Sequence, residues 1–140
     1  MPDLETAAKV VGAASRPNVG ILIDTLHFDR SDSSVSQIGS IPTHWLPMTH
    51  LCDAPAEKPT TIEGLLHTAR AERLPPGEGW LDIAPILKAM PSDTQIALEV
   101  PMRRLTSLEG PEAVARHVHD AAVRFLANSA NVPEGRALSN

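Results

Sequence analysis

The sequence predicts an α/β fold in which about three parallel strands with flanking helices form part of a β/α barrel. Three short apolar runs, each closed by an acidic or imidazole side chain, are typical of strands buried on both faces of a parallel sheet. Helical patterns alternate with these runs, which favours right-handed crossovers between parallel strands. A length of 140 residues is too small for a complete eightfold barrel, which needs about 250 residues.

The first half of the sequence alternates between helix and strand patterns. Residues 3–15 predict a helix, because Asp3 is a suitable cap and apolar side chains recur at spacings of three and four. The apolar run at 19–25 predicts the first strand, and another run predicts a second strand over about 46–52. The polar segment between them is compatible with a short helix at 33–39 that opens with a serine cap.

The second half begins with the longest connection of the chain, residues 54–79, which prolines and glycines interrupt. Residues 61–71 have the pattern of one or two helical turns, and a loop this long in a compact domain is usually functional or disordered. The remaining predictions are a helix over 81–90, a third strand over about 94–100, a helix over 111–128 and a flexible tail over 129–140.

Composition and charge argue against several classes of protein. A formal net charge of −5 disfavours a nucleic-acid partner, which calls for a basic surface. No apolar stretch approaches about 18 residues, so no membrane partner is expected. The single cysteine, Cys52, and the lack of a signal-peptide pattern at the start favour a cytoplasmic protein.

Metal-ligating side chains lie at the ends of all three predicted strands: Asp24, His50 and Glu99. In parallel barrels the functional residues gather at the carboxyl ends of the strands, so these three are candidates for one shared site. Each has an ordinary alternative, such as a capping role for Asp24 or a satisfied core position for His50. Together they form an oxygen-rich set with one imidazole, which favours Mn²⁺, Mg²⁺ or Co²⁺ and also admits Zn²⁺.

Two other residues are candidates for substrate contact. His27 lies just past the end of the first strand, and its alternative role is that of a loop histidine bonded to a carbonyl. Arg73 precedes a Pro-Gly-x-Gly turn, in which glycine permits a close backbone approach. Its guanidinium is suited to clamp a hydroxyl or carboxylate, with a plain surface arginine as the alternative. Cys52 is interpreted as a packing residue rather than a nucleophile.

Four motifs, spread over about residues 19–101, carry a resemblance to a known family. They are Asp24-Thr25-Leu26-His27, His50-Leu51-Cys52-Asp53, the R-x-x-P-G-x-G-x-x-D pattern from Arg73 to Asp82, and Leu98-Glu99-Val100-Pro101. In order and spacing they resemble the ends of the sixth, seventh and eighth strands of the sugar isomerase/epimerase superfamily, whose members have the xylose isomerase-like TIM barrel. The resemblance implies that residues 1–128 are the C-terminal portion of such a barrel.

The resemblance also implies a site and a reaction. Members of the superfamily hold a divalent metal with two glutamates, an aspartate and a histidine. The matching positions here are Asp24, His50 and Glu99 for the metal, with His27 and Arg73 in contact with a small sugar or keto-polyol substrate. The implied chemistry is proton transfer next to a carbonyl through a metal-stabilised enediolate, in which Glu99 is also an acid/base group.

The sequence departs from the superfamily in one respect. The second metal-binding glutamate belongs to the fifth strand, which would precede residue 1, and strands one to five have no counterpart. Three alternatives follow: a truncated copy, one piece of a larger protein that supplies the missing N-terminal half, or a homo-oligomer that pairs its open edges. The alternative function is a catalytically incomplete remnant that acts as a metal- or sugar-binding or oligomeric module. Nucleic-acid repair is disfavoured by the acidic charge.

Overall fold

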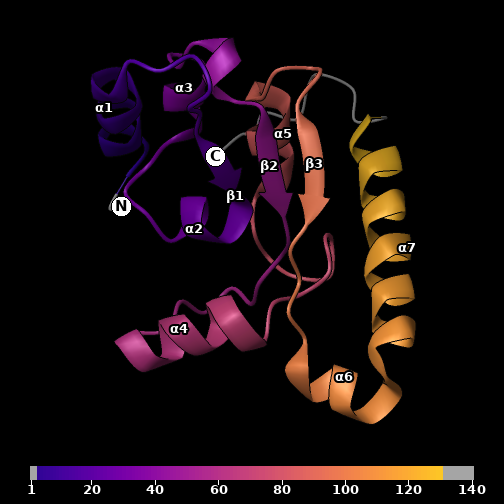
Figure 1. Cartoon of the computed structure of the whole chain (residues 1–140). Coiled ribbons are helices and arrows are strands. Elements are labelled where there is room, and N and C mark those ends of the chain that lie inside the picture. Colours follow the sequence, from indigo (N-terminus) through magenta and orange to yellow (C-terminus); the bar gives the residue numbers. More distant parts are fainter. Residues whose placement is uncertain (1–2, 131–140) are drawn as a thin grey trace, which may run out of the picture.

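The computed structural model describes residues 3–130 of the chain (Figure 1). Helices alternate with short strands along it. In order, the elements are α1 (Leu4–Ala14), β1 (Leu22–Asp24), α2 (Thr25–Asp29), α3 (Val35–Ile38), the 3-10 helix η1 (Thr43–Trp45), β2 (Met48–Leu51), α4 (Ile62–Ala71), α5 (Ile83–Ala89), β3 (Gln95–Leu98), α6 (Arg103–Glu109) and α7 (Pro111–Ala130). Within residues 3–130 no helix is long and apolar enough to cross a membrane.

The three strands form one parallel sheet in the order β1-β2-β3. Asp24 of β1 lies beside His50 of β2, which in turn lies beside Ala97 of β3. All three strands point the same way, and their carboxyl ends face the side on which α4 and α6 lie (Figure 1). The predicted α/β fold, with three parallel strands and flanking helices, is thereby confirmed.

One face of the sheet is packed against helices. Ile23 of β1 is buried in a cluster with side chains from α1, α3 and α5. Helix α1 contributes Leu4 and Val11, which recur at helical spacing. Asp3 caps this helix, because its Oδ1 accepts a 2.7 Å hydrogen bond from the Thr6 N–H. Because this face is buried, the register of the strand is fixed. Alternate residues point either to the helices or to the other face of the sheet.

The opposite face of β1 and β2 is open. Side chains alternate along a strand, so Leu22 and Asp24 point away from the buried Ile23. Leu22 is 44% exposed. An open hollow of about 1050 Å³ extends over this face and past the edge of β1 that faces away from β2, so its lining includes Ile23 and residues of α1 as well as residues of β2, α2 and α4. The carboxyl end of the sheet therefore borders open space on one side and a packed core on the other.

The local structure departs from the sequence pattern in several segments. The pattern does not predict α2, η1 or α6. Helix α2 begins directly after β1 because Asp24 is its cap. The observed strand, Leu22–Asp24, is therefore shorter than the strand predicted over 19–25. Helix α4 has ten residues, more than the expected one or two turns, and Thr61 caps it by accepting a 3.1 Å bond from the Gly64 N–H.

The predicted C-terminal helix opens where the proline pattern places it. Pro111 is the first residue of α7, where its missing N–H costs no helical hydrogen bond. Gly110 before it has φ of +86°, a conformation that favours glycine. The helix continues to Ala130, so residues 129 and 130 of the expected tail are helical, and residues 131–140 lie outside the described part of the chain.

Candidate metal centre

Asp24 ends β1 and caps α2 at the same time. Its Oδ1 accepts a 3.0 Å hydrogen bond from the His27 N–H, and its Oδ2 accepts a 2.7 Å bond from Arg73 Nη1. The side chain is only 7% exposed. Both oxygens have partners, which a buried carboxylate requires.

His50 and Glu99 lie next to Asp24 in space. Glu99 follows β3 and is two residues beyond Ala97, the neighbour of His50, so it belongs to the same face of the sheet. His50 Nδ1 lies 3.1 Å from Glu99 Oε2 and 3.9 Å from Asp24 Oδ2. One ligand atom from each residue lies within 4.8 Å of the other two. The structure thus brings together the three residues that the sequence nominates as metal ligands.

Arg73 joins the two carboxylates of this cluster. Its Nη1 donates to Asp24 Oδ2, and its Nη2 forms a 3.0 Å salt bridge with Glu99 Oε2. Its Nε donates to the Ala69 carbonyl at 2.9 Å, and Nη1 also lies 3.3 Å from the Cys52 sulfur. At 3% exposure the guanidinium has little surface left for a substrate. The sequence predicts Arg73 at the site but not its pairing with the carboxylates.

The backbone around Arg73 is held between the ends of two strands. Asp53 and Leu74 exchange two backbone hydrogen bonds of 2.8 and 2.9 Å, and the Arg73 N–H donates to the Pro101 carbonyl at 2.9 Å. Glu72 forms a further bridge with Met102. The extended segment that carries Arg73 is therefore fixed on both sides, which directs the guanidinium to the carboxyl ends of β1 and β3.

Asp53 fixes the glycine-rich turn that follows Arg73. Its carboxylate accepts four backbone hydrogen bonds of 2.8 to 3.1 Å, from the N–H groups of Ala54, Gly77, Gly79 and Leu81. Gly77 has φ of +82°, and a Cβ on Gly79 would collide with the Asp53 carboxylate. The final aspartate of the His50–Asp53 motif thus anchors the turn and lies outside the metal-ligand cluster. Its spacing from His50 alone does not indicate this role.

The electrostatics of the cluster depend on Arg73. Burial raises the pKa of the Asp24 carboxyl, but the hydrogen bonds from the Arg73 side chain and the His27 backbone outweigh it, so the pKa lies below its ordinary value of 3.8. Burial likewise raises the pKa of the Cys52 thiol, which keeps it protonated. Two carboxylates and one guanidinium leave the cluster with one net negative charge when His50 is neutral.

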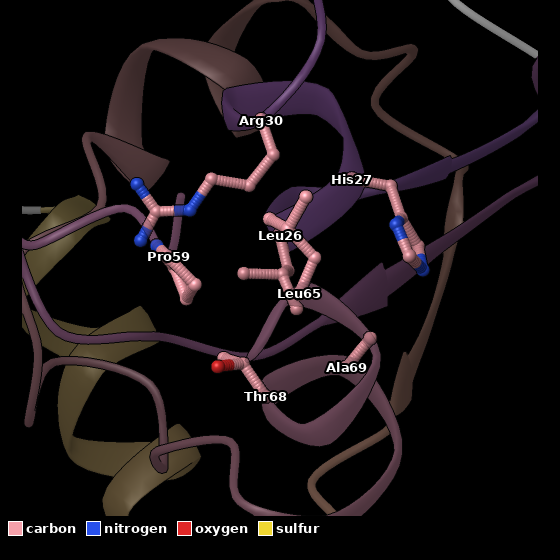
Figure 2. Close-up of a pocket in the computed structure, with 7 residues that line it drawn as sticks. All are labelled: Leu26, His27, Arg30, Pro59, Leu65, Thr68 and Ala69. Carbon is pink, nitrogen blue, oxygen red and sulfur yellow. The ribbon is translucent and has the colours of Figure 1, made fainter. Parts of the chain in front are cut away.

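His27 is exposed in the first turn of α2 and lines the hollow beside the cluster. A second, small cavity of about 40 Å³ lies between α2 and α4, where Leu26 and Leu65 separate His27 from Arg30 (Figure 2). This cavity has room for little more than water, because a single water needs about 10–15 Å³ of such space. The hollow over the open face is therefore the space that suits a sugar-sized ligand.

The donor set of the cluster fits a divalent cation. Two carboxylates and one imidazole are hard-to-borderline ligands that suit Mn²⁺, Co²⁺ and Zn²⁺, and Mg²⁺ when water supplies further ligands. The residual negative charge favours a cation, and the adjoining hollow leaves space for a substrate. Arg73 already binds an oxygen of each carboxylate, so a cation held by Asp24, His50 and Glu99 would share those carboxylates with the guanidinium.

Comparisons with known proteins agree with this architecture. The family model described as xylose isomerase-like TIM barrel matches residues 1–126. Among solved structures, the IOLI protein with a binding zinc atom superposes with a TM-score of 0.68 at 21% identity, over 91% of this chain and 43% of that chain. A xylose isomerase domain protein from Alicyclobacillus acidocaldarius gives 0.64 at 23% identity, with the same 91% and 43% coverage.

A third structure is a fusion of a xylose isomerase-like TIM barrel with 4-hydroxyphenylpyruvate dioxygenase. It gives a TM-score of 0.62 at 19% identity, over 99% of this chain and 23% of that chain. No curated protein matches the sequence. This chain thus spans less than half the length of these structures, and at such identities they establish its fold as part of a barrel. With 126 residues matched by the family model, the chain belongs to the xylose isomerase-like TIM barrel family.

Proposed function

We propose that this chain carries three metal ligands and one acid/base group of a divalent-metal-dependent sugar isomerase/epimerase. The observation that supports this most is the meeting of Asp24, His50 and Glu99 at the carboxyl ends of three adjacent parallel strands. When bound, the metal supplies a Lewis acid for the carbonyl oxygen of a sugar or keto-polyol. The zinc in the IOLI structure is consistent with a divalent ion in this fold.

The residues of the cluster and its surroundings have different roles in proton transfer, metal binding and substrate contact. Glu99 is 46% exposed, so of the two carboxylates it has room to exchange a proton with the carbon next to the carbonyl. Asp24 is buried and doubly hydrogen-bonded, which suits a fixed ligand. Arg73 orients both carboxylates and acts on the substrate through them. His27, exposed on the hollow, contacts a substrate hydroxyl.

Metal binding by the chain tests the ligand set. Mn²⁺ affinity is measured by electron paramagnetic resonance of free Mn²⁺ in the native chain and in Asp24→Asn, His50→Gln and Glu99→Gln. Each variant is expected to bind Mn²⁺ at least tenfold more weakly. The exposed His67→Gln and Glu57→Gln are matched controls and are expected to bind like the native chain. Native-like affinity in all three cluster variants would refute the proposal.

Proton exchange tests the chemistry, and it is measured at a Mn²⁺ concentration that saturates Glu99→Gln as well as the native chain, so that a loss of metal does not account for a loss of exchange. Nuclear magnetic resonance in D₂O follows the loss of the C–H signal next to the carbonyl of D-fructose in the presence of the Mn²⁺-loaded chain. Glu99→Lys is unsuitable because it adds a charge, whereas Glu99→Gln keeps the shape of the side chain and removes the base. We expect exchange with the native chain and none with Glu99→Gln.

The second candidate function is a metal- or sugar-binding remnant or an oligomeric module. It is favoured by the exposure of Leu22 and by the open hollow over the sheet, which leave the site without a wall on one side. Native mass spectrometry in a Mn²⁺ buffer separates the two. A discrete homo-oligomer with about one metal per chain that also catalyses exchange supports the enzyme, and metal binding without exchange supports the remnant. In both cases the open edges of β1 and β3 are proposed to pair with a second copy or with a segment equivalent to the N-terminal half.

A further inference from the structure

Three arginines line the hollow over the open face of the sheet, and they differ in their partners. Arg73 is paired with Asp24 and Glu99. Arg30 is paired with Asp29 at 3.1 Å and donates to the Pro55 carbonyl at 2.8 Å. The Arg70 side chain, in contrast, has no ion-pair or hydrogen-bond partner among residues 3–130 and is exposed to the hollow. It is a cation available for a ligand.

Helix α4 places Arg70 close to the metal-ligand cluster. The carbonyl of Ala69, the residue before Arg70, accepts the 2.9 Å bond from Arg73 Nε, so the last turn of α4 is fixed to the arginine that binds both carboxylates. Leu65 and Leu66 of the same helix also line the hollow. Helix α4 is thus one wall of the hollow, apolar along its middle and cationic at the end next to the cluster.

The small cavity between α2 and α4 adjoins this wall but offers no comparable space. Its volume is about 40 Å³, and Leu65 and Ala69 of α4 line both the cavity and the hollow (Figure 2). A ligand larger than a few waters that contacts this part of α4 therefore occupies the hollow, which Arg70 also lines. The only acidic side chains that line this hollow within residues 3–130 are Asp3, Asp24 and Glu99. Asp3 caps α1, and the other two are bound by Arg73.

We infer that Arg70 is an anion subsite that selects substrates with a phosphate or carboxylate group at the end remote from the reacting carbonyl. The inference rests on the proposed function for the orientation of the substrate, whose carbonyl end would lie at the Asp24–His50–Glu99 cluster, whereas the contact of Arg70 with the anionic group does not itself require the metal. With a divalent cation bound, the two carboxylates and Arg73 leave the cluster with one net positive charge, so an anionic substrate is attracted by both ends of the site. The guanidinium of Arg70 is suited to bidentate contact with either group.

The test compares three ketoses that differ at one end: D-fructose, D-fructose 6-phosphate and D-fructuronate. Their affinities are measured by isothermal titration calorimetry with the 140-residue chain, with and without Mn²⁺. For the native chain we expect one or both anionic ketoses to bind at least fivefold more tightly than D-fructose, and the tighter of the two identifies phosphate or carboxylate. Arg70→Gln is expected to abolish this preference and leave the affinity for D-fructose and Mn²⁺ unchanged.

Two further variants keep the test specific. Arg70→Lys retains the positive charge and is expected to recover at least part of the preference. Arg16→Gln removes an exposed arginine outside the hollow and is expected to retain all of it. Equal binding of the three ketoses by the native chain, no binding of any of them, or an unchanged preference in Arg70→Gln would each overturn the inference. Failure of the proposed function looks different: Mn²⁺ does not bind, while a preference that depends on Arg70 persists in the metal-free chain and still supports the subsite.

Discussion

The two faces of the β1–β2 sheet are built from alternate residues of the same strands, yet different interactions hold the side chains of each face in place. On the packed face, Ile23 is buried among helix side chains with no polar contact to direct it. On the open face, Asp24 and His50 lie in fixed positions because hydrogen bonds and ion pairs hold them. Burial sets the position of the strands, and polar contacts then set the position of the functional side chains.

Substitutions on the two faces are therefore expected to act in different ways. A change on the packed face alters the free energy of unfolding through lost burial, and its effect should not depend on pH. A change among the polar contacts should alter stability through unsatisfied partners, with a dependence on pH where a carboxylate titrates. Substitution of an exposed apolar residue on the open face should change neither the free energy of unfolding nor its dependence on pH by much.

The strongest test concerns the polar anchor of the turn after Arg73. Asp53→Ala removes the acceptor of four backbone N–H groups, three of them in the turn, and leaves them without a protein partner. We expect a loss of about 4 kcal/mol in the free energy of unfolding, because each orphaned donor costs about 1–3 kcal/mol and water recovers part of it. Urea unfolding monitored by circular dichroism measures the loss, and a change below about 1 kcal/mol would contradict the assigned role.

A substitution on the packed face should lower the free energy of unfolding by less than Asp53→Ala does, and without any contribution from polar groups. Ile23→Ala removes buried methyl and methylene groups from the cluster with α1, α3 and α5. We expect a loss of about 3 kcal/mol, within the range of about 2–5 kcal/mol for such truncations. Urea unfolding should give the same difference at pH 5 and pH 8. A difference that varies with pH would show that the two faces are not independent.

Arg73→Met breaks the polar arrangement and should change the response to acid. In the native chain the pKa of Asp24 is lowered, so its contribution to stability is present above the ordinary value of 3.8 and is lost as pH falls through the folded-state pKa. In Arg73→Met the effect of burial, which raises the pKa of Asp24, is opposed only by the lowering effects of the His27 backbone and of Glu99. We expect a loss of about 2 kcal/mol at pH 7 and a smaller further loss on acidification.

Unfolding in urea between pH 2.5 and pH 6, in the presence of a chelator, measures this response. Arg104→Met is the matched control, because Arg104 lies in the first turn of α6 and takes no part in the ion pairs of the cluster. An acid-induced loss in Arg73→Met equal to that of the native chain would show that Arg73 does not set the pKa of Asp24.

The smallest effect is expected for the exposed residue beside Ile23. Leu22→Ala should cost less than about 1 kcal/mol, because nearly half of the side chain is already in contact with solvent and little burial is lost. The comparison with Ile23→Ala in the same unfolding experiment is direct, since the two residues are adjacent in β1. A loss equal to that of Ile23→Ala would indicate that another chain covers the open face in solution.

Much of this arrangement is predictable from the sequence, and the exceptions share a physical cause. The strands follow from apolar runs, and the cluster follows from the residue types that close them, because parallel strands bring their carboxyl ends together. The partners of Arg73 could not be predicted, since Asp24 is 49 residues away in the chain and only the tertiary fold joins them. Helix α2 could not be predicted either, because its cap, Asp24, is also the last residue of a strand.

The paired backbone bonds between Asp53 and Leu74 bring the two ends of the intervening segment to one point. Residues 57–66 can accordingly be regarded as an exchangeable cassette, whose sequence and length can change without moving the strand ends that it leaves and rejoins. Only the last turn of α4 is tied to the cluster, through the Ala69 carbonyl. A library confined to this cassette would vary the wall of the hollow while it preserves the metal ligands, which makes the segment a natural place to evolve or engineer new selectivity.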